Sequence, residues 1–220
     1  AVDLGGTNMR VALVDTHFQV VYKEYSYTQA FRTKDTLIAA LLHSLDLIIK
    51  VKALKKENIV GIGIGLPGPI DVAQGVVHFF PNIPGWKEVK LKSILQEAVR
   101  LPVFLDNDAN LMALAEHRLG AARGFANAVC LTLGTGVGGG IILNGELYRG
   151  SSFAAGELGH IPINEDGPRC NCGGVACLES YIGNKSIREQ VRKLFRKNVP
   201  LEEVSVLAKH RDARAVQIWS

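Results

Sequence analysis

Near its start the chain carries the stretch Asp3-Leu4-Gly5-Gly6-Thr7-Asn8-Met9-Arg10, in which a glycine turn separates two apolar segments. The segments Ala1–Leu4 and Met9–Val14 are predicted to be strands, because both are short and apolar and are joined by the turn. A third strand is predicted over Phe18–Tyr27. Glycine lets the backbone approach a bulky anion, whose oxygens can then bind the exposed N–H groups. The turn is therefore a candidate anion site.

A second turn of this kind lies in the stretch Leu133-Gly134-Thr135-Gly136-Val137-Gly138-Gly139-Gly140, between predicted strands at Ala128–Leu133 and Gly139–Leu143. Neither turn continues into Gly-Lys-Ser/Thr and neither opens a helix, so a P-loop and a dinucleotide fingerprint are both excluded. A single glycine hairpin is usually no more than a hairpin. Two of them, one in each half of the chain, suggest two loops that close on one phosphate chain. Thr7 and Thr135 add hydroxyl groups to these loops. Asp3, beside the first turn, is either a magnesium ligand acting through water or a turn-capping carboxylate.

The remaining pattern mixes helices with strands, which predicts the α/β class. An apolar series predicts one long helix from Lys34 to Lys56, and a second pattern predicts a helix that ends at Gly120. The alternating Ile and Gly residues of Ile59–Leu66 predict a strand closely approached by another backbone. A further helix is predicted over Leu91–Arg100, a buried strand over Val103–Leu105 and a hairpin around Asn144-Gly145. We place a domain boundary near residue 120, which gives domains at 1–120 and 121–220.

The composition is that of an ordinary globular protein. The 220 residues include 25 Lys+Arg and 21 Asp+Glu, for a net charge of +4, and 47% are hydrophobic. No apolar run reaches the roughly 18 residues that a membrane helix needs. Positive charge collects between Lys185 and Ser220, where nine Lys/Arg face four Asp/Glu. A nucleic-acid surface is one interpretation. The apolar stripe Ile187-Val191-Leu194-Phe195 has helical spacing and favours a solvated helix face instead.

Three of the four cysteines lie close together and predict a metal site. Cys170, Cys172 and Cys177 follow His160 in the pattern His-x9-Cys-x-Cys-x4-Cys. Three thiolates and one imidazole make a closed tetrahedral zinc set, which is typical of a structural zinc rather than a catalytic one. The alternative for His160 is a core histidine that bonds a carboxylate. Cys130 stands in an apolar run and is interpreted as core.

The segment Asp106-Asn107-Asp108-Ala109-Asn110 crowds two acids and two amides between a strand and a helix. Helix capping needs only one such residue. The excess suggests recognition of hydroxyl groups together with a general base that accepts a hydroxyl proton.

These motifs, together with Gly65-Leu66-Pro67-Gly68 and Gly156-Glu157-Leu158-Gly159-His160, resemble the ROK family of sugar kinases and sugar-responsive repressors. The resemblance implies an actin/hexokinase-like (ribonuclease-H-like) fold of two domains with a cleft between them. It places ATP and Mg²⁺ at the glycine turns and a hexose deeper in the cleft. The residues implied in nucleotide binding are Asp3, Gly5, Gly6, Thr7, Arg10, Thr135 and Gly136.

The resemblance also assigns roles at the sugar. Asp108 matches the catalytic base and Asn107 a sugar contact, with Asp106 as the rival carboxylate. Glu157, His160 and Glu179 match residues that bind sugar hydroxyls. The zinc ligands matched are His160, Cys170, Cys172 and Cys177. The segments Gly68-Pro69-Ile70-Asp71 and Pro81-Asn82-Ile83-Pro84-Gly85-Trp86 look most like bacterial glucokinases. Gly68 and Asn82 are then expected on the sugar side, and Trp86 either walls the sugar or anchors its loop.

The expected activity is ATP-dependent phosphorylation of the primary hydroxyl of a hexose, glucose to glucose 6-phosphate, as in glycolysis. N-acetylmannosamine, N-acetylglucosamine and fructose stay open as substrates, and a sugar-sensing repressor is the alternative function. We expect a cytoplasmic homodimer or higher homo-oligomer with no nucleic-acid or membrane partner. Kinases of this family are longer than this chain, so the adenosine-binding residues are expected outside it.

Overall fold

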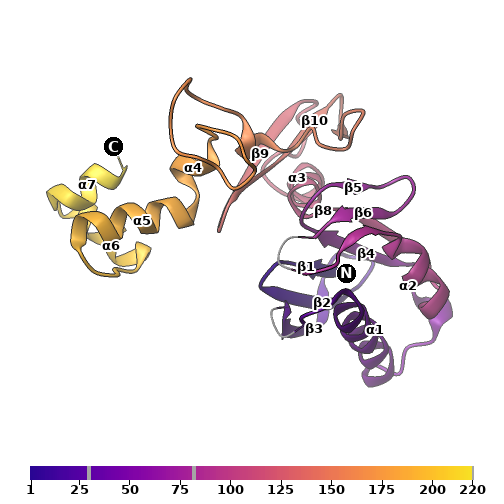
Figure 1. Cartoon of the computed structure of the whole chain (residues 1–220). Helices are drawn as coiled ribbons and strands as arrows, with labels where there is room; N and C mark the ends of the chain where they lie inside the picture. Colours follow the sequence, from indigo (N-terminus) through magenta and orange to yellow (C-terminus); the bar gives the residue numbers. More distant parts are fainter. Residues whose placement is uncertain (29–30, 81–82, 220) are drawn as a thin grey trace.

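The protein is a mixed α/β molecule built on three sheets (Figure 1). The computed structural model describes residues 1–28, 31–80 and 83–219. Within these ranges no helix is both long and apolar enough to cross a membrane. The largest hydrophobic core combines buried side chains of the five-stranded sheet with those of the helices and the small sheet beside it, from Val2 to Leu105 in the sequence.

The largest sheet has five strands in the order β3-β2-β1-β4-β8. Its strands are β1 (Val2–Leu4), β2 (Asn8–Val14), β3 (Val20–Tyr27), β4 (Ile62–Leu66) and β8 (Val103–Asn107). β1, β2 and β3 pair antiparallel, whereas β1, β4 and β8 are parallel. Asp3 stands in register with Gly65, and Gly65 with Asp106. The three residues therefore form a row on one face of the sheet, near the carboxyl ends of the parallel strands.

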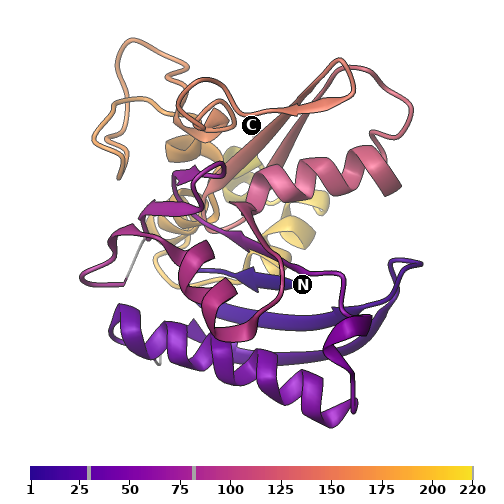
Figure 2. The ribbon, with the colours of Figure 1, turned by 90° about the vertical axis from the view of Figure 1, so that its right-hand side faces the viewer.

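Helix α1 (Lys34–Val51) covers one face of this sheet with a buried stripe of Leu37, Leu41, Leu45 and Ile48 (Figure 2). It begins at a capping box in which Thr33 and Thr36 satisfy each other's backbone N–H groups. The predicted extension to Lys56 is wrong. The helix ends at Val51, which is exposed, and Ala53 turns the chain with a φ of 47°. A short 3₁₀ helix, η2 (Lys56–Asn58), follows.

A small three-stranded sheet, which the pattern did not predict, follows β4. Its strands are β5 (Ile70–Asp71), β6 (Val76–Phe79) and β7 (Lys87–Val89). Trp86 is only 2% exposed and packs on Phe80 with ring centroids 5.1 Å apart. Trp86 is thus an anchor of its loop in the core, one of the two roles considered for it. Helix α2 (Leu91–Val99) then leads to β8, as expected.

The third sheet consists of β9 (Ala128–Leu133), β10 (Val137–Leu143) and β11 (Glu146–Tyr148) in the order β11-β10-β9. Helix α3 (Asp108–Leu119), which ends at Gly120 as predicted, packs on β10 (Figures 1 and 2). A Cβ on Gly138 would lie 2.9 Å from the Ala109 Cβ, and one on Gly140 only 2.5 Å from the Ala113 Cβ. Two glycines of the second glycine stretch therefore bring β10 onto α3, a use different from anion binding.

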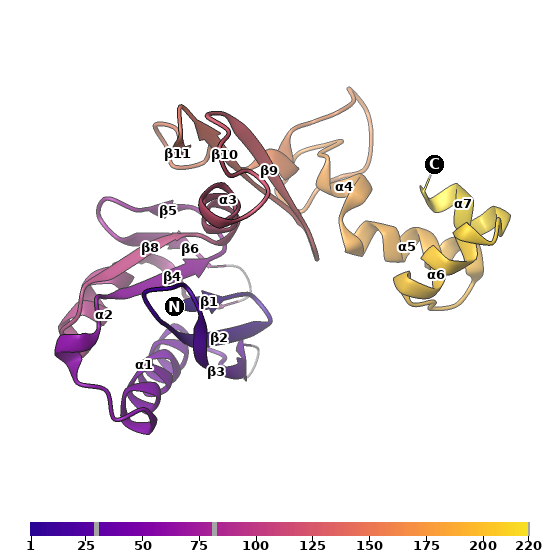
Figure 3. The same cartoon turned by 180° about the vertical axis from the view of Figure 1, so that it is seen from behind.

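The last segments are η3 (Leu158–His160), α4 (Glu179–Ile182), α5 (Asn184–Phe195), α6 (Leu201–Lys209) and α7 (Ala213–Trp219). Helices α5 to α7 share a small core that includes the predicted stripe residues Ile187, Val191 and Phe195. These helices stand apart from the five-stranded sheet, at the far end of the molecule (Figures 1 and 3). The domain boundary near residue 120 stays a prediction.

Candidate active site and metal centre

The turn between β8 and α3 starts the helix through Asn107, its N-cap residue. The Asn107 Oδ1 accepts the Ala109 N–H at 2.9 Å and the Asn110 N–H at 3.2 Å, so it satisfies two of the free amides at the helix start. Its Nδ2 donates to the Gly68 carbonyl at 3.4 Å. The capping interpretation therefore holds for Asn107, and the fold brings this residue into contact with Gly68.

Asp106 is buried, and donors surround both of its oxygens. Oδ1 accepts the Asn107 N–H at 2.8 Å and the Asn110 Nδ2 at 3.2 Å. Oδ2 accepts Arg149 Nε at 2.9 Å and Nη2 at 2.6 Å. A carboxylate has about four acceptor positions, and four donors occupy them here. Asp106 is therefore a structural anion with no acceptor position left for a substrate proton.

Asp108, two residues later, has the opposite environment. Its Oδ1 accepts the Ala109 N–H at 2.8 Å, and its Oδ2 has no hydrogen-bond partner among the residues described. The side chain reaches solvent, yet the protein around it removes enough water to raise the pKa of its carboxyl. The charge of Asp3 raises this pKa as well, while the Ala109 N–H lowers it. Asp108 thus offers a carboxylate oxygen to an incoming group and sits close enough to Asp3 to feel its charge.

The first glycine turn joins β1 to β2 and opens no helix, as predicted. The Gly5 N–H closes it by donating to the Asn8 carbonyl at 2.8 Å. Arg10, which faces Asp3 across the strand pair, donates to the Asp3 Oδ2 at 3.1 Å. Both side chains are about half exposed, and Thr7 is exposed as well. The turn therefore presents one cation and one carboxylate on an accessible edge, beside the backbone of Gly6.

The second glycine turn joins β9 to β10 and leaves Thr135 exposed. A Cβ on Gly136 would come within 2.2 Å of the Glu179 Oε2, so no larger residue fits there without moving that carboxylate. The same oxygen accepts the Val137 N–H at 2.9 Å. Glu179, expected on sugar hydroxyls, is here bound to the turn through one of its oxygens.

The four predicted metal ligands come together in one cluster. One ligand atom from each of His160, Cys170, Cys172 and Cys177 lies within 4.8 Å of all the others. His160 Nδ1 is 3.6 Å from the Cys170 Sγ, and the sulfurs of Cys172 and Cys177 are 3.7 Å apart. Sulfurs on a tetrahedral zinc ion lie about 3.8 Å apart when each Zn–S bond is about 2.3 Å. The spacing of this cluster therefore fits such an ion.

The surroundings shift the pKa values of the clustered thiols in opposite directions. Desolvation and the neighbouring thiols raise the pKa of Cys177 to about 12, whereas the Gly174 N–H lowers the pKa of Cys172. A divalent cation stabilises thiolates and would reverse the shift at Cys177. The donor set thus has both the geometry and the chemistry of a structural metal site.

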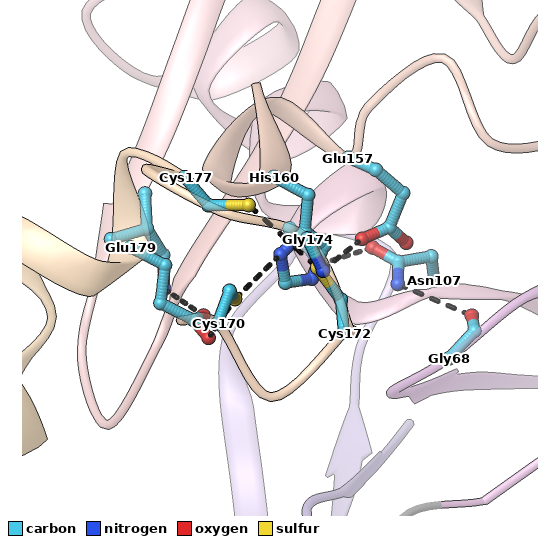
Figure 4. A network of polar contacts seen from close by, with 11 residues as sticks. Gly68, Asn107, Glu157, His160, Cys170, Cys172, Gly174, Cys177 and Glu179 are labelled. Atoms are coloured by element: carbon cyan, nitrogen blue, oxygen red, sulfur yellow. Dashed lines mark hydrogen bonds and ion pairs between the residues drawn. The ribbon is translucent and has the colours of Figure 1, made fainter. Parts of the chain in front are cut away.

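His160 stands between this cluster and the sugar-side residues (Figure 4). Its Nδ1 faces the Cys170 sulfur, while its Nε2 lies 3.8 Å from the Glu157 Oε2. One ring nitrogen is therefore directed to each site, as the expected double role requires. Glu157 is exposed at the start of η3. Asn82 lies outside the described residues.

Arg149 is a residue beside the candidate site that the motifs did not indicate. It follows β11 and reaches Asp106 from 43 residues away in the sequence. A single arginine carries no local pattern, so only the folded structure reveals this ion pair.

Comparison with known proteins finds both sugar kinases and repressors among the relatives of this chain. The chain is 38% identical over 196 residues to a glucokinase of Thermotoga maritima, which covers 89% of the chain and 60% of that protein. It is 34% identical over 198 residues to a xylose repressor of Caldicellulosiruptor bescii, which covers 90% of the chain and 49% of that protein. The chain thus spans about half to three fifths of the length of these curated relatives.

Solved structures agree in fold. A ROK hexokinase from Thermus thermophilus matches 99% of the chain and 70% of its own, with a TM-score of 0.81 and 35% identity. A ROK glucokinase from Streptomyces griseus, solved with glucose and AMPPNP, matches 99% of the chain and 72% of its own, with a TM-score of 0.78 and 30% identity. The expected α/β, actin/hexokinase-like fold is confirmed. The ROK family model matches residues 1–220, and the chain belongs to the ROK family.

Proposed function

We propose that the protein is an ATP-dependent hexose kinase that phosphorylates the primary hydroxyl of its sugar, with glucose as the first candidate. One observation carries the proposal. Where β8 meets α3, Asp106 and Asn107 are engaged in structural hydrogen bonds, whereas Asp108 keeps a carboxylate oxygen open. Transfer of a phosphoryl group to an alcohol needs such a group to accept the hydroxyl proton.

The neighbouring residues suit the other requirements of the reaction. Asn107 precedes Asp108 and contacts Gly68, and Glu157 and His160 supply hydrogen-bonding groups for further hydroxyls. The glycine turns with Arg10 and Thr135 supply donors for phosphate oxygens. Mg²⁺, held through water by Asp3, neutralises phosphate charge when bound. The loss of hydration that raises the pKa of Asp108 also makes its carboxylate a stronger base.

The metal cluster is proposed to hold structural zinc. Four protein ligands close the coordination sphere, so the ion leaves no open position for a substrate. Its contribution is to hold η3 and the segment before α4 in place, and with them Glu157 and Glu179.

A sugar-sensing repressor is the second candidate, because the chain is also 34% identical to a xylose repressor. Such a protein needs the sugar-binding groups but no turnover. Xylose as a pyranose has no primary hydroxyl, and it therefore separates the two functions chemically.

The test is a panel of sugars with ATP and Mg²⁺ on the full-length protein, with ADP and sugar phosphate measured together. The panel contains glucose, fructose, N-acetylglucosamine, N-acetylmannosamine and xylose. We expect equal amounts of ADP and sugar phosphate with glucose, and none with xylose. Tight sugar binding without any ADP above background would support the sensor and overturn the kinase.

A further inference from the structure

An ion pair connects the base-bearing turn to a distant part of the chain. Arg149 directs Nε and Nη2 to the same oxygen of Asp106, at 2.9 and 2.6 Å. The Asp106 side chain is only 7% exposed, and that of Arg149 is 32% exposed. Hydrogen bonds to an ionised partner at these distances are among the strong ones, and burial strengthens them.

The other Asp106 oxygen extends this connection to both sides of Asp108. It accepts the Asn107 backbone N–H and the Asn110 side-chain amide. Asn107 in turn caps the amides of Ala109 and Asn110. The position of Asp108 on the first turn of α3 therefore depends on the placement of the Asp106 carboxylate.

Arg149 also begins the segment that leads to the sugar-side residues. Its carbonyl accepts the Ala155 N–H at 3.1 Å, two residues before Glu157. The same residue thus anchors the start of this segment and holds the β8–α3 turn. This ion pair is therefore one direct link between the turn that carries Asp108 and the segment that carries Glu157, beside the packing of β10 on α3 and η3.

We propose that Arg149 is a positioning residue of the active site, which acts through Asp106 to hold Asp108 against the substrate hydroxyl. This inference rests on the proposed kinase function. Without Arg149, Asp106 is a buried carboxylate with two of its acceptor positions unfilled. Removing one partner of a buried pair leaves the other charge uncompensated, so Asp106 is expected to move toward water or take up a proton. Either change shifts the turn that presents Asp108.

The test compares Arg149→Met, Arg149→Lys and the double variant Arg149→Met/Asp106→Asn with the wild-type full-length protein. Lys50→Met is the matched control, because it removes an exposed ion pair with Asp46 on α1, outside the site. Arg149→Met is expected to lower kcat by about 10- to 100-fold, since a small misplacement of a catalytic group has effects of this size. The KM for the sugar should stay within about threefold, because the sugar-side groups remain. The kcat of Arg149→Lys should lie between those of Arg149→Met and wild type, because lysine keeps the positive charge but lacks the two parallel N–H donors of arginine.

The second readout is hydrogen exchange at the Ala109 and Asn110 amides, measured in the same variants. Hydrogen exchange should become faster in Arg149→Met, because the Asp106 carboxylate has lost its partner. It should slow again in the double variant, because position 106 then carries no charge while its side chain can keep the hydrogen bonds to Asn107 and Asn110. The double variant should also regain part of the lost kcat. The proposal would be overturned if Arg149→Met had unchanged hydrogen exchange and a kcat equal to that of Lys50→Met. It would also be overturned if the loss of kcat in the double variant equalled the sum, in free energy, of the losses in the two single variants. If the wild-type protein phosphorylates no sugar, the kinase function fails, and the exchange comparison still decides whether Arg149 holds this turn.

Discussion

Asp106 and Asp108 show how environment, rather than residue type, assigns chemistry. The two carboxylates are two residues apart on one turn. Asp106 receives four donors and is buried, whereas Asp108 receives one backbone donor and keeps an oxygen open. A saturated carboxylate has no position for a substrate hydroxyl, so we propose Asp108 as the base and Asp106 as an anchor of the turn.

The raised pKa of Asp108 predicts a stability effect with a definite sign. When the folded-state pKa lies above the unfolded value, the folded protein binds the Asp108 proton more tightly than the unfolded chain does. The resulting contribution to folding stability is present at low pH and is lost as the pH rises through the folded-state pKa. At neutral pH the ionised side chain therefore destabilises the fold. Asp108→Asn, which keeps an oxygen for the Ala109 N–H, should raise the free energy of unfolding at pH 7. The gain should shrink as the pH falls toward about 4, where the unfolded carboxyl takes up its proton. Thermal unfolding at both pH values measures this.

Asp35 provides the matched control for this measurement, since it also stands in the first turn of a helix. Asp35→Asn removes a favourable charge at a helix N-terminus, worth about 0.3–1 kcal/mol, and should lower stability at pH 7. A loss of stability in both variants would contradict the predicted sign at Asp108.

Glu157 is predicted to contribute to sugar binding more than to turnover. Glu157→Ala should raise the KM for the sugar by about 10- to 100-fold, the size expected for loss of a hydrogen bond to a charged group. The kcat should change less, because such a contact is made equally in the ground and transition states. Glu165→Ala, in an exposed loop, serves as control. An unchanged KM for every sugar in the panel would remove Glu157 from the site.

At the scale of elements, the strong patterns predicted most of the structure, and the weak ones failed for physical reasons. The strands around both glycine turns, α2 and the end of α3 at Gly120 follow from periodicity and turn residues. β5, β6 and β7 have two to four residues each, too few to show an alternation. The end of α1 was missed because no glycine or proline marks it.

The metal cluster should be the element that holds η3, α4 and the second glycine turn together. Glu179 links them, since its Oε2 accepts the Val137 N–H while its Oε1 lies 3.9 Å from the Cys170 sulfur. We expect one zinc ion per chain, and structural zinc contributes on the order of 10 kcal/mol to local folding. Removing it with a chelator should speed hydrogen exchange at the Val137 amide and weaken sugar binding.

Cys172→Ser should reproduce the effect of the chelator, and Cys130→Ser should not, because Cys130 lies in β9 outside the cluster. Elemental analysis gives the stoichiometry, and calorimetry gives the sugar affinity. Fully active protein without bound metal would contradict this account of the cluster.

Across the whole molecule, the predicted metal ligands gather in one cluster, and the fold also explains how polar residues far apart in the sequence come together. Parallel β1, β4 and β8 bring Asp3 and Asp106 onto one row although 103 positions separate them, with Gly65 between. Arg149 could not be foreseen, because its partner is set by the packing of α3 on the third sheet. The motifs do not determine which sugar the proposed kinase takes, and the sugar panel tests this.

We propose that this ROK protein transfers a phosphoryl group from ATP to a hexose with Asp108 as the base. The most direct measurement is the kcat for glucose of wild type, Asp108→Asn and Asp106→Asn in the full-length protein, with sugar affinity determined by calorimetry. Loss of a general base lowers kcat by about 10²–10⁴-fold, so Asp108→Asn should fall by about 10² or more and still bind the sugar. The kcat of Asp106→Asn should fall less than that of Asp108→Asn, because the substitution weakens an anchor of the turn and leaves the proposed base in place. Turnover near wild type in Asp108→Asn, with Asp106→Asn inactive, would contradict the assignment and make Asp106 the base.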